Sequence, residues 1–211
     1  MNQRQLPLLP EPTLRRLPWY LAYVKTLLGR GTEYVSSTAI SKALNVDASQ
    51  IAKDLSFLNL KGKTRIGYEV KALEEALSDF LGFKATHKAC VFGVGNLGKA
   101  LLLDKGLADY GLQIVGGVDT DPALAGSIVE GVEIVAPDEL QAIMDRHNPS
   151  VAILTVPAEA AQEVADSAIS AGFSAIWNFS PYRVKVPRNI ALANTSIYAH
   201  LALIYNRLDR F

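Results

Sequence analysis

The sequence contains one cysteine, three histidines and no long apolar run. Its cysteine, Cys90, has no partner for an internal disulfide and falls in a predicted strand, where a thiol packs as an inert apolar side chain. No apolar stretch approaches the roughly 20 residues of a membrane helix, and residues 1–12 lack the apolar segment of a signal peptide. These absences exclude a disulfide scaffold and a membrane protein, and we expect a cytoplasmic protein without a metal site.

The chain also lacks an excess of either charge, because 21 Lys and Arg balance 21 Asp and Glu. The balance hides an asymmetry: residues 1–84 hold 12 basic and 8 acidic residues, whereas residues 85–211 hold 9 and 13. A length of 211 residues suits two small domains. A basic half joined to an acidic half is a hint of nucleic-acid contact by the first domain.

The first half is predicted to begin with an arm and a helix. Residues 1–12 carry three prolines among polar residues, which indicates a disordered arm. Apolar residues then recur at helical spacing over residues 13–29. Because proline is tolerated in a helix chiefly in the first turn, Pro18 is expected to lie close to the start of this helix.

Two short helices and a basic hairpin are predicted to follow. Ser36 and Ser37 are candidate N-caps for one helix, and Asp47 is a candidate N-cap for the next. The stretch that comes after them is polar, punctuated by glycine and flanked by strand-forming residues. The predicted elements are helices over 38–44, 48–58 and 73–82 and a β-hairpin over 61–70. This order is that of a winged helix-turn-helix DNA-binding domain, which we place at residues 13–82.

The second half opens on the most informative motif of the chain. A predicted buried strand, Ala89 to Phe92, runs into Gly93, Gly95 and Gly98 in the pattern G-x-G-x-x-G and then into a helix. This arrangement lays a dinucleotide pyrophosphate on a helix N-terminus. Strands are then predicted over 113–119, 132–135, 151–156 and 175–179 and helices over 137–146 and 157–171, with a short or missing crossover helix between 119 and 132. The fold class is therefore α/β, and residues 85–190 are assigned to a Rossmann-like parallel-sheet domain that binds NAD(H).

Candidate cofactor residues lie in the motif and at predicted strand ends. Gly93 would allow the tight turn, Gly95 the close approach of the pyrophosphate, and Gly98 the packing of helix on strand. Asp119, 21 residues past Gly98, would accept hydrogen bonds from the adenosine ribose and repel a 2′-phosphate, which favours NADH and NAD over their phosphorylated forms. The full predicted set is Gly93, Val94, Gly95, Asn96, Leu97, Gly98, Asp119, Thr155, Val156, Pro157 and Phe179.

No catalytic residue is predicted beside this site. His87 precedes the first strand, His147 follows a helix, and His200 lies in the last helix, so none is placed over a nicotinamide. The strand ends carry residues that bind a ring without transforming a substrate. A nicotinamide-dependent oxidoreductase with an accessory domain is the alternative, and turnover would reveal it.

Polar and basic residues of the first domain are the candidate DNA contacts. Three residues of the second helix of the turn would present one edge to a major groove. Three basic residues alternate through the predicted hairpin and would share a face suited to phosphate or minor-groove contact. The predicted set is Ser36 and Ser37, then Ser49, Gln50 and Lys53 on the helix, and Lys61, Lys63 and Arg65 in the hairpin.

The chain is predicted to end in an amphipathic helix over residues 195–211. Its apolar positions recur every three to four residues and form a stripe, while Arg207, Asp209 and Arg210 stay off it. The stripe consists of Ile197, Leu201, Ile204, Leu208 and Phe211. It is too apolar to face water and needs a partner surface, which predicts a homodimer.

A winged helix joined to an NAD site without catalytic groups resembles the Rex family of redox-sensing transcriptional repressors. The matching residues are Arg16-Leu17-Pro18, Val35-Ser36-Ser37, Gln50 to Ser56, Gly67-Tyr68, Gly93 to Gly98, Ala152 to Ala158, and Asn178-Phe179 before Pro181. The resemblance implies a homodimer whose C-terminal helix is swapped between subunits. It also implies binding to an inverted-repeat operator in double-stranded DNA, and release when NADH rather than NAD is bound.

In the predicted recognition helix, Ala52 stands where the family often has Arg, which removes one possible phosphate or base contact. Three further positions depart from the family pattern. Ala22 stands where Rex proteins carry an Arg, Ser196 where they carry an Asp, and Asp104 where they carry a Tyr, and in the family these residues belong to the switch between domains. Loss of both the Arg and the Asp avoids a lone buried charge. The response to NADH therefore stays open, and a Rex-like regulator with another nucleotide effector, such as a CoA-like adenine nucleotide, is a further alternative.

Overall fold

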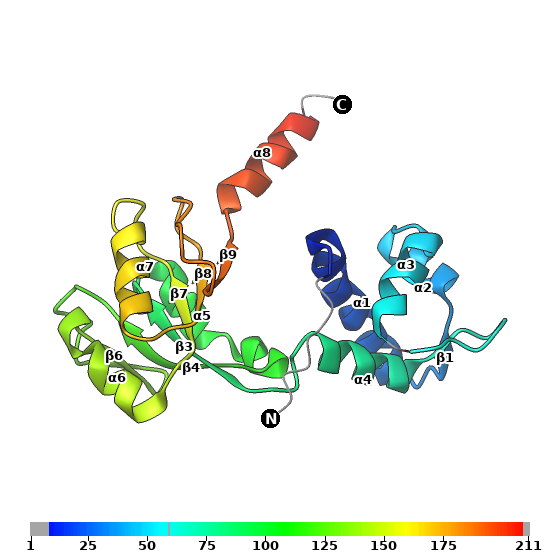
Figure 1. Ribbon diagram of the computed structural model, residues 1–211, viewed down its shortest axis with the longest axis horizontal. Helices are drawn as coiled ribbons and strands as arrows, with labels where there is room; N and C mark the ends of the chain where they lie inside the picture. The colour runs from blue at the N-terminus through cyan, green and yellow to red at the C-terminus, as the bar shows by residue number, and fades with distance from the viewer. Residues whose placement is uncertain (1–8, 59, 209–211) are drawn as a thin grey trace. The chain divides into compact units, whose positions relative to one another are not determined.

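The computed structural model describes residues 9–58 and 60–208 of the chain. The chain divides into two compact units, with the boundary between Lys84 and Ala85 (Figure 1). Within the described ranges, no helix is long and apolar enough to cross a membrane.

The N-terminal unit is mainly helical. Its elements are α1 (Glu11–Gly29), β1 (Tyr34–Val35), α2 (Ser37–Leu44), α3 (Ala48–Leu55), a 3₁₀ turn (Ser56–Leu58), β2 (Tyr68–Glu69) and α4 (Val70–Phe80). One apolar cluster joins the four helices, with Leu17, Tyr20 and Leu21 of α1 fully buried against side chains of α2, α3 and α4. Two of the predicted caps are confirmed: Ser36 Oγ accepts a hydrogen bond from the Ala39 N–H, and Asp47 accepts one from the Ser49 N–H. Ser37, the other candidate, is the first residue of α2 and not its cap.

The position expected for Pro18 is wrong. Helix α1 begins at Glu11, with Pro12 in its first turn, so Pro18 lies in the helix interior. A proline there removes one helical hydrogen bond, but its neighbours Leu17 and Tyr20 are fully buried, and their packing keeps this segment helical. Of the arm predicted over 1–12, residues 1–8 lie outside the described residues.

The hairpin predicted over 61–70 is also wrong in its pairing. Strand β2 pairs antiparallel with β1, which precedes α2 and α3 in the sequence. It does not pair with residues 61–63, the other arm of the predicted hairpin. Lys63 and Gly67 form a single bridge that closes a tight turn, in which Arg65 has φ +66°. Because residues 64–66 form this turn, strand alternation does not place Lys63 and Arg65 on one face.

The C-terminal unit contains a seven-stranded sheet among its described residues, in the order β5-β6-β4-β3-β7-β8-β9. All neighbours are parallel except β5 and β6. The strands are β3 (His87–Phe92), β4 (Leu112–Val118), β5 (Ile128–Val129), β6 (Val132–Val135), β7 (Val151–Leu154), β8 (Ala175–Asn178) and β9 (Ala191–Asn194). The helices are α5 (Asn96–Leu103), α6 (Leu140–His147), α7 (Ala161–Ser170) and α8 (Ile197–Leu208), with 3₁₀ segments at Lys105–Tyr110 and Pro137–Glu139.

Alternation along β3 divides the core of this unit between two sheet faces. Cys90 and Phe92 pack with residues of α6 and α7, whereas Ala89 and Val91 pack with residues of α5. The predicted strands are confirmed to within two residues at their ends. The segment between Asp119 and Val132 holds no α-helix, as expected, but strands β5 and β9 were not predicted.

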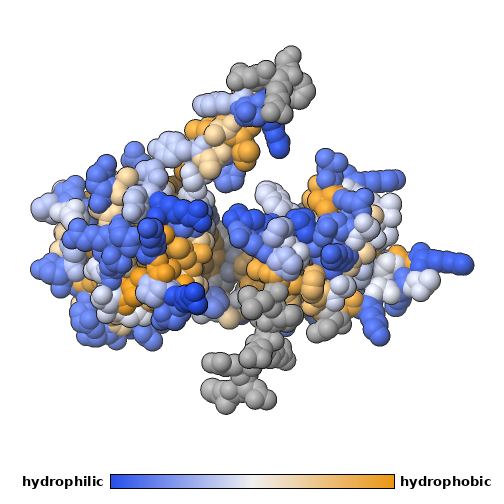
Figure 2. Space-filling view, turned by 45° about the horizontal axis from the view of Figure 1, so that its top comes forward, coloured by the Kyte–Doolittle hydropathy of each residue, from blue (hydrophilic) through white to orange (hydrophobic). Residues whose placement is uncertain are grey.

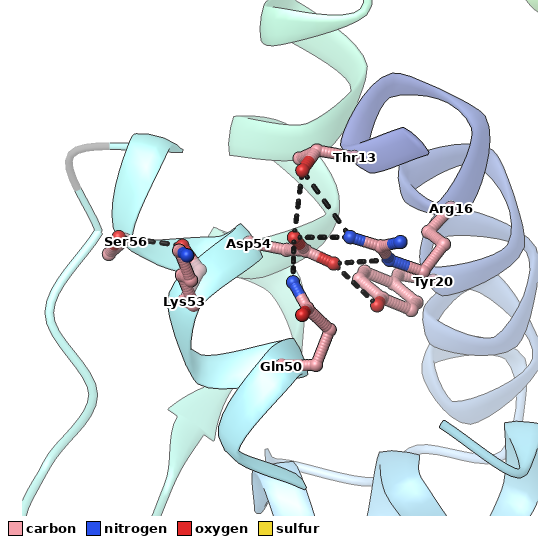
Figure 3. A network of polar contacts seen from close by, with 7 residues as sticks. All are labelled: Thr13, Arg16, Tyr20, Gln50, Lys53, Asp54 and Ser56. Carbon is pink, nitrogen blue, oxygen red and sulfur yellow. Dashed lines mark hydrogen bonds and ion pairs between the residues drawn. The ribbon is translucent and has the colours of Figure 1, made fainter. Parts of the chain in front are cut away.

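A buried carboxylate connects α3 to α1 in the N-terminal unit (Figure 3). Asp54 is fully buried, and four side chains donate hydrogen bonds to its two oxygens. The donors are Arg16 through Nε (2.7 Å) and Nη2 (2.9 Å), Tyr20 Oη (2.8 Å), Gln50 Nε2 (2.9 Å) and Thr13 Oγ1 (3.0 Å). Three of the four donors lie on α1, so this network holds α3 against the first helix.

The network keeps Asp54 ionised. Burial alone raises the pKa of a carboxyl, but the hydrogen bonds from Arg16 and the other donors outweigh burial and hold the pKa of Asp54 below its ordinary value. The hydrogen bond to Asp54 raises the pKa of Arg16. Burial, followed by the hydrogen bond to Asp54, raises the pKa of Tyr20 to about 12. Asp54 and Arg16 are therefore both charged at neutral pH.

Asp54→Ala should destabilise the N-terminal unit by about 3 kcal/mol, because it leaves Arg16 without its carboxylate partner and two buried donors, Thr13 and Tyr20, without an acceptor. Amide hydrogen exchange in α1 and α3 measures this loss for one unit of a two-unit chain. The exposed ion pair of Arg146 with Glu133, in the C-terminal unit, provides the control. Arg146→Ala should lower the unfolding free energy of that unit by less than about 1 kcal/mol. Because the folded pKa of Asp54 is depressed, its contribution should be full above about pH 5 and lost as pH falls below about 4. Equal losses in the two variants would contradict the role of the network.

Candidate nucleotide and DNA sites

The candidate nucleotide site lies where the carboxyl ends of the parallel strands meet. Strand β3 occupies the centre of the sheet, with β4 on one side and β7 on the other. From β3 the chain first adds β4 and β6 on one side of the sheet and then returns to add β7 and β8 on the other side. Open α/β sheets bind their ligands at such switch points. The loop that carries the glycine motif follows β3 directly.

The three glycines of the motif have three different environments. Gly93 has φ +87°, which only glycine adopts readily. A Cβ on Gly98 would lie 2.1 Å from the Gly93 carbonyl oxygen, so only glycine lets α5 approach the end of β3 this closely. A Cβ on Gly95, by contrast, would meet no atom within 4 Å. The first and third glycines are required by the protein itself, whereas the space beside Gly95 is open.

Two side chains form hydrogen bonds with the backbone of this glycine loop. Asp119 Oδ2 accepts a hydrogen bond from the Val94 N–H at 2.5 Å, and its Oδ1 accepts one from the Asp121 N–H at 2.9 Å. Thr155 Oγ1 donates to the Gly93 carbonyl oxygen at 2.5 Å. Both residues therefore shape the loop, and Thr155 does so with a hydroxyl that is turned toward the protein.

The other predicted residues lie along the same edge of the sheet. Val156 contacts the position of Gly93, since a Cβ there would lie 2.9 Å from Val156 Cγ1. Phe179 follows β8, donates its N–H to the Leu154 carbonyl oxygen and packs against Trp177 with 4.6 Å between ring centroids. Pro157 is exposed. Asn96 and Leu97 begin α5, the first exposed and the second half-buried.

A dinucleotide fits what these residues offer. The open space at Gly95 adjoins the N-terminus of α5, where free N–H groups attract phosphate oxygens. The Asp119 carboxylate is half-buried and still has acceptor capacity beside its two N–H partners. When bound, a nicotinamide dinucleotide supplies a ring whose charge changes with its redox state.

The DNA candidates lie at the start of α2, on α3 and in residues 61–65. Ser49 and Lys53 are exposed on α3, although the Ser49 hydroxyl donates to Asp47. Gln50 is half-buried, and its amide nitrogen donates to Asp54. Ser36 caps α2 and Ser37 begins it, both half-buried. The structure therefore gives two of the predicted contacts, Ser36 and Gln50, defined structural roles.

The basic residues that follow α3 are all exposed. Lys61 and Arg65 have exposed side chains. Lys63 Nζ donates to Tyr34 Oη at 2.5 Å and lies 4.7 Å from the centre of the Tyr34 ring. This hydrogen bond raises the pKa of Lys63, so the ammonium is charged and held close to β1.

Three further positions identified from the sequence have local roles. Ser196 Oγ accepts a hydrogen bond from the Ala199 N–H and so caps α8, and Asp104 Oδ1 accepts one from the Gly106 N–H. Ala22 is exposed on α1. These contacts explain why short polar residues suit positions 104 and 196.

Sequence reasoning missed the role of Asp54. The available signal was a carboxylate between Ile51 and Leu55 on the apolar face of a helix, because a buried charge requires partners. The pattern could not name Thr13, Arg16 and Tyr20 as those partners, since they lie 34 to 41 residues away in the sequence.

Chemistry at the remaining residues is limited. Burial raises the pKa of the Cys90 thiol to about 12, so it is not a nucleophile. In the part of the chain that the structure describes, no three His, Cys, Asp or Glu side chains gather in a way that could hold a metal ion.

Known proteins resemble this chain over nearly its whole length. A family model described as "Putative DNA-binding protein N-terminus" matches residues 9–56, and one described as "CoA binding domain" matches residues 84–182. The redox-sensing transcriptional repressor Rex of Bacteroides fragilis is 54% identical over 200 residues, which cover 95% of this chain and 91% of the relative. The Rex protein of Porphyromonas gingivalis is 49% identical and covers 94% of this chain and 91% of the relative. The chain belongs to the Rex family of redox-sensing transcriptional repressors.

Solved structures agree with this assignment. The crystal structure of RSP in complex with β-NAD⁺ and operator DNA has a TM-score of 0.91 at 32% identity, and the match covers 96% of this chain and 94% of that one. The crystal structure of RSP with β-NADH has a TM-score of 0.86 at the same identity and covers 96% and 95%. Rex proteins are transcriptional repressors and not enzymes, so the oxidoreductase alternative is rejected.

Proposed function

We propose that this Rex protein is a homodimer that represses transcription at an inverted-repeat operator and releases the DNA when NADH binds. Residues 13–82 would form a winged helix-turn-helix domain, residues 85–190 the NAD(H) domain, and residues 195–211 a helix swapped between subunits. The observation that carries the proposal is the open glycine loop at the sheet switch point, in a chain whose N-terminal unit has exposed basic residues on α3 and in the turn after it. The structures of RSP with β-NAD⁺, β-NADH and operator DNA support the choice of ligands.

NADH binding should depend on the absence of a side chain at residue 95. Gly95→Ala should weaken NADH binding by tenfold or more with unchanged stability, because a Cβ would enter the space proposed for the pyrophosphate and touch no protein atom. Gly29→Ala is the matched control, since its Cβ also meets no atom within 4 Å. Calorimetric titration with NADH, NADPH and CoA measures the effect and separates the alternative effectors. Equal NADH affinity for Gly95→Ala and the wild type would overturn the site.

The described part of α8 supports the dimer. None of its residues from Ile197 to Leu208 is buried, and Figure 2 shows apolar side chains gathered on this helix at the top of the view. Of the stripe predicted from the sequence, Ile197, Ile204 and Leu208 are exposed and Leu201 is half-buried. Phe211 lies outside the described residues. So many exposed apolar side chains on one helix indicate a surface that a second subunit covers.

The full-length protein should therefore be dimeric at micromolar concentration, by light scattering. Replacing Ile204 and Leu208 with Asp should shift it to a monomer, because two charges would have to be buried in the interface. Replacing the exposed residues Asn206 and Arg207 with Asp changes the same helix off the stripe and should leave the dimer intact. A monomeric wild type would contradict the swapped helix.

Operator binding should depend on the basic turn after α3. Replacing Lys63 and Arg65 with Ala should weaken binding and lower the slope of log affinity against log salt by about one for each lost phosphate contact. NADH affinity should not change. The control replaces Lys185 and Arg188, two exposed basic residues of the other unit, with Ala. If both double variants lowered the salt slope equally, general charge and not the turn would explain the binding.

The redox response should follow from the charge of the nicotinamide ring. NAD carries a positive ring, which suits the apolar residues Val156 and Phe179 less well than the neutral ring of NADH. NADH releases DNA only if it binds the free dimer more tightly than the DNA-bound dimer, and a tenfold release requires a difference of about 1.4 kcal/mol. Operator affinity should therefore fall at least tenfold with saturating NADH and less with saturating NAD. The same affinity with NADH, with NAD and with neither would show that Ala22, Asp104 and Ser196 mark a Rex protein without this response.

A further inference from the structure

The Asp54 network orients the side-chain amide of Gln50. A carboxylate accepts hydrogen bonds and cannot donate them, so the group that faces Asp54 Oδ1 at 2.9 Å must be the amide nitrogen of Gln50. The opposite orientation would place two oxygens against each other. Since Asp54 stays ionised, with its position fixed by Arg16 and Tyr20, the orientation of Gln50 is determined before any DNA arrives.

The carbonyl oxygen of this amide is left without a partner within the described part of the chain and is not buried. Gln50 Oε1 has no hydrogen-bond partner among the described residues, and no side-chain oxygen in that part of the chain is both buried and unpartnered. One of the two N–H bonds of Nε2 is used by Asp54, which leaves one N–H and one carbonyl oxygen. Gln50 carries this pair on α3, where it follows the exposed Ser49 in the sequence and its side chain is bonded to the buried Asp54.

We propose that Gln50, held by Asp54, reads one adenine in each half of the operator. In the major groove adenine offers the N6 amino group as donor and N7 as acceptor, which match the free oxygen and the free N–H of this amide. Guanine offers two acceptors, N7 and O6, and would need both N–H bonds, one of which Asp54 occupies. Cytosine and thymine leave one of the two groups of the amide unpaired. The inference rests on the proposed DNA-binding function and adds to it the base that α3 selects.

The test uses an inverted-repeat duplex that the wild-type protein selects from a random library. Each adenine of one half-site is replaced in turn by 7-deazaadenine, which pairs with thymine but lacks the N7 acceptor. The wild type should lose about tenfold in affinity at one of these positions. Gln50→Met keeps the length of the side chain without its hydrogen bonds. In this variant, 7-deazaadenine at the same position should cause no further loss of affinity. Gln50→Ala repeats the measurement with a smaller side chain, in case Met disturbs the packing.

A control and a second readout separate base reading from structural support. Gln141→Met removes the same kind of bond on α6, where Gln141 donates to Asp145 four residues on, and should retain the adenine sensitivity of the wild type. If the Gln50 variants bind all duplexes more weakly but keep the wild-type sensitivity to 7-deazaadenine, Gln50 only supports α3 and the inference is overturned. A wild type that is insensitive at every adenine overturns it as well. A wild type that selects no duplex at all overturns the proposed function, and the inference with it.

Discussion

The buried carboxylate of Asp54 is the interaction on which the N-terminal unit depends. It lies in an apolar core, where an isolated charge is strongly unfavourable, and it is stabilised there only because Arg16 pairs with it and three other groups donate to it. This requirement for several simultaneous partners makes the contact between α1 and α3 specific. Apolar packing alone would allow the two helices to slide, whereas a bidentate guanidinium and a carboxylate allow one arrangement.

The same network extends from the core to the surface. Asp54 joins buried donors on α1 to the half-buried amide of Gln50 on α3, so the packing of the unit and the chemistry of its exposed helix share one group. A side chain that is positioned in advance loses less conformational entropy on binding than one that must first be ordered. The structural role of α3 and its proposed role in DNA recognition are therefore coupled.

The C-terminal unit follows the same principle with backbone groups. The glycine loop is shaped by Gly93 in a left-handed conformation, by the close contact of Gly98 with β3 and by hydrogen bonds from Thr155 and to Asp119. These contacts shape the loop around the open position at Gly95. In both units a site is prepared by residues that need not touch the ligand themselves.

The amino-acid sequence by itself determined the local elements and the family. The glycine motif, the caps at Ser36 and Asp47 and the apolar periodicities depend on residues a few positions apart, and so they are legible without a structure. The tertiary structure alone decided the partners of Asp54, the inward turn of the Thr155 hydroxyl, the pairing of β2 with β1 and the orientation of Gln50. Each of these joins groups that lie far apart along the chain or depends on such a contact, and no local pattern records which distant donor meets which acceptor.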